Sequence, residues 1–269
     1  MLWGMTASPI LIATLAGIVL WAMTALGSAV VLVHREPSRR LLDTLLGFTA
    51  GVMLAASYWG LLAPAVELAR DSGGSAWFAP TMGFLSGGLA LWGLDKLLPH
   101  LHPGMADEPP EGPSTPWRRV TLLFLAVTLH HIPEGLAVGV AFGAAAVGAK
   151  ATSLGAALAL AAGLGLQNMP EGVAVAVSMR REGMSPRRSF LYGQATGVVE
   201  PLAAALGAAV VVLSQAAMPF ALGFAAGAMI FVVIEELVPE CQTCGNTDIA
   251  TLGAIVGFAS MMVLDIALG

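Results

Sequence analysis

The sequence is poor in cysteine and in charge, and each shortage excludes a class of protein. Two cysteines, Cys241 and Cys244, are too few for the disulfide framework of a small secreted protein. Charged residues account for 11% of the 269 residues, whereas a soluble domain carries about a quarter. The 12 lysines and arginines form no long basic tract, so no nucleic-acid partner is expected.

Apolar residues predominate in the composition. Hydrophobic residues make up 57% of the chain, and the mean hydropathy is +0.81. A membrane-spanning helix needs about 20 apolar residues, and such runs follow one another almost from end to end. The sequence therefore predicts an all-α, polytopic membrane protein in which residues 1–269 form a single transmembrane domain. The start, MLWGMTASPI, lacks a positive n-region, so we expect a retained span and not a cleaved signal.

Turn-rich or charged segments divide the chain into eight predicted spans. HREPSRR, DSGGS and RREGMSPRR are such segments. A further one, the Pro-rich and acidic segment 100–117, is expected to form a cytoplasmic loop. The predicted spans are about 8–33, 41–69, 76–99, 119–143, 150–179, 187–213, 217–239 and 247–268.

The positions of the cations predict which way the spans run. If the N-terminus lies outside and eight spans alternate, only Arg70 and Lys150 lie on the outer side. The excess on the inner side is the positive-inside pattern, so both termini are expected to be extracytoplasmic, in a bacterial inner membrane. The inner cations are Arg35, Arg39, Arg40, Lys96, Arg118, Arg119, Arg180, Arg181, Arg187 and Arg188.

Two adjacent predicted spans carry nearly the same polar motif. PEGLAVGV at 133–140 and PEGVAVAV at 170–177 share six of eight positions. The two spans cross in opposite directions, which is typical of an inverted repeat with a substrate site at its midplane. Each repeat adds a polar side chain four residues before its glutamate, giving His130 with Glu134 and Gln167 with Glu171. This spacing places both side chains on one helix face. Pro133 and Pro170 are expected to bend both helices around something polar.

Polar side chains on four predicted spans share one depth. Counted from the nearest inner arginine, Met53 is 13 residues away, His130 is 11, Gln167 is 13 and Glu200 is 12. At 1.5 Å per residue, all four lie roughly 16–20 Å above the inner flank, near the middle of the membrane.

The carboxylates at this depth need a compensating charge. Glu134, Glu171 and Glu200 have no lysine or arginine at their level, so they are protonated or bind a cation. Imidazole beside carboxylates favours zinc, iron, nickel or copper over calcium and magnesium. Three carboxylates with His, Gln and Asn exceed one tetrahedral site and suit two ions bridged by Glu134 and Glu171. The alternatives are a proton relay, interhelical bonding by the His and Gln side chains, and plain packing for Met53.

Six motifs of this sequence resemble the bacterial branch of the ZIP (Zrt/Irt-like) divalent-metal transporters. They are HHIPEG, QNMPEG and GQATGVVEP, together with GVMLAAS, VIEELVPE and MMVLDIALG. The resemblance implies two metal positions at the midplane. One set of ligands would be Met53, His130, Glu134, Gln167 and Glu171. The other would be His131, Glu134, Asn168, Glu171 and Glu200.

Two of these positions depart from the family pattern. The position of His131 is commonly Asn in this branch, and that of Asn168 can be Asp. The second set is therefore less anionic here and carries a softer ligand. The resemblance also implies that a bundle of spans 1, 4, 5 and 6 slides against the others, and the Gly-rich faces GFLSGG and GFAAGAM suit close helix contacts.

Charged residues near the span ends suggest an entrance and an exit. Glu67 and Asp265 lie near the outer rim, where they would attract cations, or are simply solvated carboxylates. The cysteines of CQTC are expected to be reduced thiols, with metal transfer as the alternative. The inner side carries the candidate exit residues Asp95, His100, His102, Glu235, Glu236 and Glu240.

The sequence thus predicts a transporter and not an enzyme. We expect zinc, or cadmium, iron or manganese, to enter the cytoplasm by alternating access through a binuclear midplane site. No organic cofactor is expected, and the expected partners are divalent ions, membrane lipid and a second copy of the chain. The alternatives are an intramembrane zinc metalloenzyme and a proton-coupled solute carrier.

Overall fold

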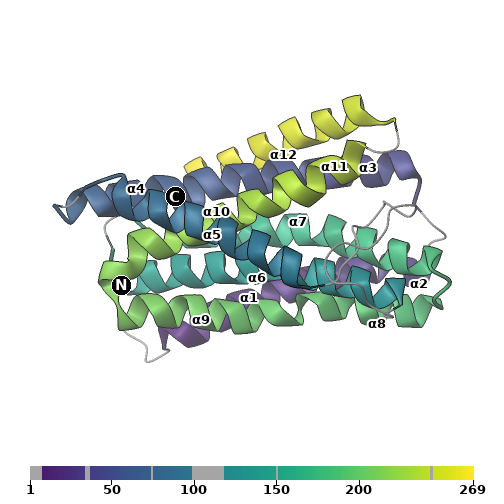
Figure 1. Cartoon of the computed structure of the whole chain (residues 1–269), viewed down its shortest axis with the longest axis horizontal. Helices are drawn as coiled ribbons and strands as arrows, with labels where there is room; N and C mark the ends of the chain where they lie inside the picture. The colour runs from purple at the N-terminus through teal and green to yellow at the C-terminus, as the bar shows by residue number, and fades with distance from the viewer. Residues whose placement is uncertain (1–7, 34–36, 74, 99–117, 150, 243–244) are drawn as a thin grey trace.

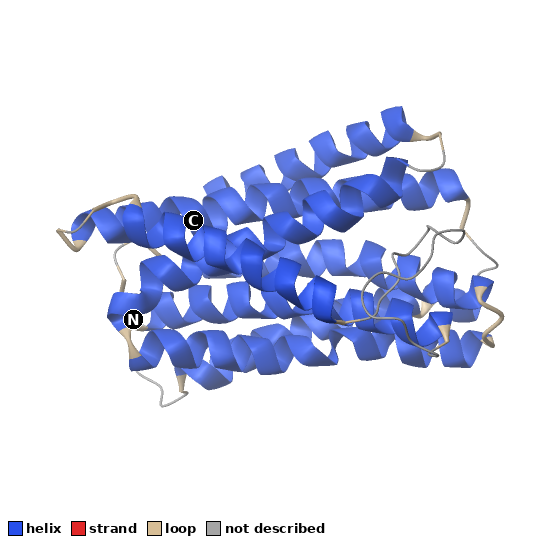
Figure 2. Cartoon of the chain, viewed as in Figure 1, coloured by secondary structure: helices blue, strands red, loops and turns tan. Residues whose placement is uncertain are grey.

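The protein is a bundle of long helices. The computed structural model describes residues 8–33, 37–73, 75–98, 118–149, 151–242 and 245–269. Within these residues every regular element is helical, and no strand is present (Figure 2). The predicted all-α class is therefore confirmed. The cytoplasmic loop predicted at 100–117, with His100 and His102, lies outside the described residues, as do Lys150 and Cys244.

The helices join into eight rods that run along the bundle axis (Figure 1). In chain order the rods are α1 and α2 (Pro9–Ser28, Val30–Val33); α3, η1 and α4 (Arg39–Ala55, Ala56–Leu62, Ala63–Asp71); α5 (Phe78–Leu97); α6 (Arg119–Ala146); α7 (Leu154–Arg181); α8, η2 and α9 (Pro186–Ala195, Thr196–Val198, Val199–Leu213); η3, α10, η4 and α11 (Gln215–Ala217, Met218–Val232, Val233–Leu237, Val238–Gln242); and α12 (Thr247–Leu268).

Six rods are long and apolar enough to cross a membrane, namely Pro9–Val33, Arg39–Asp71, Arg119–Ala146, Pro186–Leu213, Gln215–Gln242 and Thr247–Leu268. The other two, α5 and α7, are less apolar. Gln167, Asn168 and Glu171 interrupt the apolar run of α7 without breaking the helix. Asp95 and Lys96 lie in the last turn of α5. The chain is a polytopic membrane protein by its six apolar rods, whereas crossing by α5 and α7 remains a prediction.

The first and last helices have their free ends at the same end of the bundle (Figure 1). The arginines that begin α3 and α6 and end α7 lie at the opposite end. This end is called the arginine end below. An even number of rods places the two termini together, as the eight predicted spans require.

Local sequence signals explain where several rods begin and end. The hydroxyl oxygens of Ser38, Ser153 and Ser185 accept hydrogen bonds from backbone N–H groups in the first turns of α3, α7 and α8. These bonds satisfy donors that the helix itself leaves free. Gly183, with φ of 85°, occupies the left-handed region directly after α7, where a side chain would add strain.

Prolines accompany the irregular turns inside the rods. The wide π turns η1 and η4 end two residues before Pro64 and Pro239, and the tight turn η2 precedes Pro201. A proline lacks the N–H group that its preceding turn would bond, so a local change of winding relieves the conflict. The helix remains unbroken at Pro133 and Pro170, where bends were expected.

The rods associate in tight groups. The most extensive contacts are α3 with α12, α5 with α10, α6 with α9, and α1 with both α7 and α9. Rods 1, 4, 5 and 6 thereby form one group, called the motif bundle below because it contains both Pro-Glu-Gly motifs. Rods 2, 3, 7 and 8 form two pairs that pack against it, mainly through α3, α10 and α12.

Glycines allow backbones to touch inside these groups. A Cβ atom added at Gly51 would lie 1.9 Å from the carbonyl oxygen of Ala254. The same addition at Gly87 would lie 2.0 Å from the carbonyl oxygen of Phe224, and at Gly139 2.2 Å from that of Ala204. Small residues at such contacts are a general means of helix association in membranes.

Candidate functional site

The polar motifs meet in the centre of the motif bundle. His131 and Glu134 come from α6, Gln167, Asn168 and Glu171 come from α7, and Glu200 comes from the start of α9. All six residues are buried, and five of them have no exposed surface: His131, Glu134, Gln167, Asn168 and Glu200. Opposed helices therefore direct the two Pro-Glu-Gly motifs at one another, as their antiparallel order predicted.

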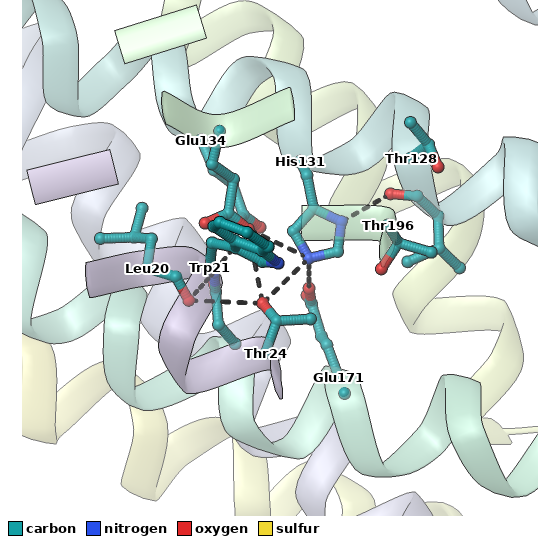
Figure 3. Close-up of polar contacts among 12 residues, drawn as sticks. Leu20, Trp21, Thr24, Thr128, His131, Glu134, Glu171 and Thr196 are labelled. Carbon is teal, nitrogen blue, oxygen red and sulfur yellow. Dashed lines mark hydrogen bonds and ion pairs between the residues drawn. The ribbon is translucent and has the colours of Figure 1, made fainter. Parts of the chain in front are cut away.

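One ring nitrogen of His131 faces the carboxylates and the Thr24 hydroxyl (Figure 3). Its Nδ1 lies 2.8 Å from the carbonyl oxygen of Val127. A carbonyl can only accept, so Nδ1 carries the proton and the neutral ring leaves Nε2 with a lone pair. This Nε2 lies 3.3 Å from Oε1 of Glu200 and 3.8 Å from Oε2 of Glu171. Three acceptors thus face one another, which is the arrangement of a cation site.

The two amides connect the remaining carboxylates. Nε2 of Gln167 donates to Oε1 of Glu134 at 2.8 Å and to Oδ1 of Asn168 at 2.6 Å. Nδ2 of Asn168 donates to Oε1 of Glu200 at 2.9 Å. The amide donors therefore hold one oxygen each of Glu134 and Glu200 and leave the other oxygen free.

Several buried oxygens at the centre have no hydrogen-bond partner. They are Oε2 of Glu134, Oε1 of Gln167, both oxygens of Glu171 and Oε2 of Glu200. Among the described residues, no lysine or arginine pairs with Glu134, Glu171 or Glu200. An unpaired buried carboxylate is costly, so these oxygens require a proton or a metal ion. His131, Glu134 and Glu171 each offer a ligand atom, and these atoms lie within 4.8 Å of one another.

His130 faces a different direction from its neighbour. Its Nε2 makes an ion-pair contact with Oε1 of Glu236 in η4. A cavity of about 20 Å³ lies here, lined by His130, Glu171, Glu236 and Glu240 among others. This is room for about one water molecule. The cavity runs from the central carboxylates towards the arginine end. Two candidate exit residues, Glu236 and Glu240, thus lie beside the site.

The other predicted residues come from rods outside the motif bundle. Met53 on α3 is completely buried in the hydrophobic core. Glu67 is exposed on α4, and Asp265 is partly buried on α12. Asp95 is buried with an oxygen 3.2 Å from Nζ of Lys96, and Glu235 is partly buried in η4.

Thr24 and Ser28 also lie at the site, although the sequence analysis did not identify them. The hydroxyl of Thr24 on α1 lies 3.5 Å from Nε2 of His131 and 3.4 Å from Oε1 of Glu200. Ser28, one turn further on, donates to the carbonyl oxygen of Gly172 at 3.1 Å. Thr24 and Ser28 are polar residues at i and i+4 in an apolar span, the same signal that revealed His130 and Glu134.

Trp21 also borders the site and fixes the neighbouring rod. Its indole Nε1 donates to the carbonyl oxygen of Gln194 at 2.9 Å and to its Oε1 at 3.0 Å. A buried tryptophan usually needs such a partner for its N–H group. The bond ties α1 to the end of α8, just before the tight turn that leads to Glu200.

A second buried polar cluster at the arginine end was also missed. Asp43 on α3 is completely buried, with Oδ1 2.7 Å from Nε of Arg39. Its Oδ2 accepts from Nδ2 of Asn246 at 2.8 Å. Arg39 also donates to the carbonyl oxygen of Glu240 at 3.0 Å. This cluster joins α3, α11 and α12. Nearby Cys241 is buried, with its Sγ donating to the carbonyl oxygen of Val238.

Comparison with known proteins agrees with the resemblance in the motifs. The family model described as ZIP Zinc transporter matches residues 117–265. Zinc transporter ZIP11 of Homo sapiens is 40% identical over 327 aligned residues, which cover 93% of this chain and 95% of that protein. Zinc transporter ZIPB of Bordetella bronchiseptica is 39% identical, covering 96% of this chain and 81% of that protein. Zinc transporter GufA of Myxococcus xanthus is 39% identical, covering 91% and 94%. The chain belongs to the ZIP zinc transporter family, a family of membrane metal transporters.

Proposed function

We propose that this protein carries Zn²⁺ from outside the cell to the cytoplasm through the central site of the motif bundle. The observation that supports this most directly is the group of buried acceptors around Nε2 of His131. This nitrogen lies 3.3 Å from Oε1 of Glu200 and 3.8 Å from Oε2 of Glu171, an oxygen without a hydrogen-bond partner, and no lysine or arginine among the described residues pairs with either carboxylate. Mixed imidazole and carboxylate ligands favour zinc over calcium or magnesium. Cadmium, iron and manganese ions are secondary candidates.

The site accommodates two ions in sequence or together. One ion would be held by His131, Glu134, Asn168, Glu171 and Glu200, which already lie together. The other would be held by Met53, His130, Glu134, Gln167 and Glu171. For His130 to join the set that contains Met53, its ring must give up the contact with Glu236 and bind the metal instead. Glu134 and Glu171 belong to both sets and would bridge the ions.

The exit path follows the small cavity between His130 and Glu240. A cation leaving Glu171 would meet Glu236 and then Glu240 on its way to the arginine end. The positive-inside pattern supports a cytoplasmic position for this end, in a bacterial inner membrane. Glu67 and Asp265 would attract cations at the opposite end.

Alternating access would move the motif bundle against the other rods. Inside each group glycines bring backbones into contact, which resists movement. Across the boundary, an added Cβ at Gly163 would meet Sδ of Met261 at 2.2 Å, and one at Gly60 would meet Cδ1 of Leu160 at 2.9 Å. Flexible side chains therefore fill part of this boundary, and such contacts can change partners more readily than two backbones can.

Zinc uptake into proteoliposomes tests the proposal. E134A/E171A should abolish uptake, because both bridging carboxylates are lost. The control D71A/D248A also removes two carboxylates, but both are exposed at helix ends, so it should transport normally. Bound zinc without uptake by the unmodified protein would favour the intramembrane metalloenzyme. Uptake of an organic solute without any metal would favour the proton-coupled carrier.

A further inference from the structure

A large cavity lies at the arginine end, away from the central site. Its volume is about 730 Å³, within the range of small-molecule sites. Its walls come from the first turn of α6, the turn between α7 and α8, and α8 itself. All of these segments belong to the motif bundle. In Figure 1 they lie at the end opposite the two termini.

The cavity carries a net positive charge. Arg118, Arg119 and Arg188 line it, and Glu182 is the acidic residue among its lining residues. Nε of Arg119 lies 3.4 Å from Oε1 of Glu182. Among the described residues, Arg118 and Arg188 pair with no carboxylate. Two guanidinium groups are therefore available, and guanidinium is well suited to phosphate oxygens.

The beginnings of two helices add to this field. α6 begins at Arg119 and α8 begins at Pro186, both in the cavity wall or next to it. The backbone N–H groups at a helix N-terminus attract anions. No side chain caps the first turn of α6. The charge of the cavity therefore favours an anionic group.

The rod that borders the cavity also carries an exposed surface suited to acyl chains. Tyr192 lines the cavity and is 44% exposed on α8. Exposed apolar residues extend from its neighbour along the α8–α9 rod, at intervals typical of one helix face, namely Leu191, Val198, Leu202, Leu206, Val210 and Leu213. Tyrosine is enriched where membrane meets water. A ligand with a phosphate group and long apolar chains would contact both surfaces, whereas free phosphate would use only one.

We propose that this cavity binds the headgroup of one anionic phospholipid, such as phosphatidylglycerol. Arg118 and Arg188 hold the phosphate, and the acyl chains lie along the part of the apolar face nearest the cavity, which includes Leu191, Val198 and Leu202. A headgroup that carries an amine would place its cation among the arginines, so zwitterionic lipids bind less well. Basic pockets between membrane helices recognise anionic headgroups in this way. The proposal does not depend on zinc transport.

Native mass spectrometry of the detergent-purified protein with phosphatidylglycerol, phosphatidylethanolamine and phosphatidylcholine tests this assignment. One phosphatidylglycerol should bind per chain in preference to the other two. R118Q/R188Q should weaken this binding on the order of 30-fold, because two phosphate contacts are lost. The control R40Q/R181Q removes two exposed charges outside the cavity at the same end, and should leave binding unchanged.

Three results would overturn the proposal. Equal binding of the three lipids would indicate general acyl contact. An equal loss in R40Q/R181Q would indicate a nonspecific charge effect. Displacement of the lipid by inorganic phosphate would indicate a site for a soluble anion. Size-exclusion elution checks the fold of each variant, and R188Q alone serves as the test if the double variant does not fold.

Discussion

The ring of His131 is held in one orientation, and this orientation determines what each of its two nitrogens contacts. The Val127 carbonyl accepts from Nδ1, which orients the ring and keeps Nε2 available. The neighbouring His130 is rotated by about 100° around the helix and meets Glu236 instead. In the transport path that we propose, these adjacent histidines would therefore serve different parts.

H131A should weaken zinc binding at least tenfold, because it removes the nitrogen that faces Glu171 and Glu200. Isothermal titration calorimetry in detergent measures this change. H130A is the matched comparison, and it should affect release towards the cytoplasm more than affinity at the centre. Unchanged zinc affinity in H131A would show that the central ion does not use this ring.

T24V should lower zinc affinity by roughly tenfold, because it removes a hydroxyl beside both His131 and Glu200 while conserving shape. T14V on the same helix is the control, since the Thr14 hydroxyl donates only to the carbonyl of Ile10 at 2.7 Å. Competition against a fluorescent zinc chelator measures both variants. Equal affinities for T24V and T14V would limit Thr24 to a structural role.

At the scale of the helices, Gly51 within a pair meets backbone, whereas Gly60 and Gly163 at the boundary meet side chains. Gly155 is the exception at the boundary, because a Cβ atom there would meet the Leu268 carbonyl oxygen. G51A would drive a Cβ atom into the Ala254 carbonyl, so it should destabilise the protein by about 1–3 kcal/mol. G163A meets only the Met261 side chain, so it should keep its thermal stability yet slow zinc uptake. Thermal unfolding in detergent and proteoliposome uptake measure the two effects.

G93A is the control for both glycine variants, because a Cβ atom there has nothing within 4 Å. It should change neither stability nor uptake. A loss of stability in G163A as large as that in G51A would contradict the distinction between the boundary and the pairs.

A comparison of the predicted spans with the observed helices shows how much of the fold the sequence predicts. The rods begin and end within a few residues of the predicted spans. The motif pair pointed to Glu134 and Glu171, whereas Glu200 came from the shared depth, and the grouping of His131 with these carboxylates came from the family resemblance. Helix partners were not predictable, because Gly-x-x-x-Gly patterns occur on several rods and do not specify which rods meet. The π turns were missed, because a proline predicts a disturbance and not its form. Asp43 was missed because its partner Asn246 is distant in sequence.

At the scale of the whole molecule, charge is sorted by position along the bundle axis. Arginines gather at one end, and acidic residues without cationic partners occupy the centre. By the positive-inside rule this separation predicts the orientation of the chain in the membrane, and it would leave the centre available to the transported cation that we propose. Arg39 and Asp43 form a buried pair at the arginine end, so the centre differs from the ends in lacking such pairs among the described residues.

Cysteine labelling in cells tests the orientation that this charge distribution predicts. In a background where Cys241 and Cys244 are alanine, a cysteine replaces exposed Ser72 after α4 or exposed Arg40 in α3. S72C should react with a membrane-impermeant maleimide in intact cells, because positive-inside sorting places that end outside. R40C should react only after the membrane is made permeable. The opposite labelling pattern would contradict the proposed direction of transport, because the path through Glu236 and Glu240 would then open to the exterior.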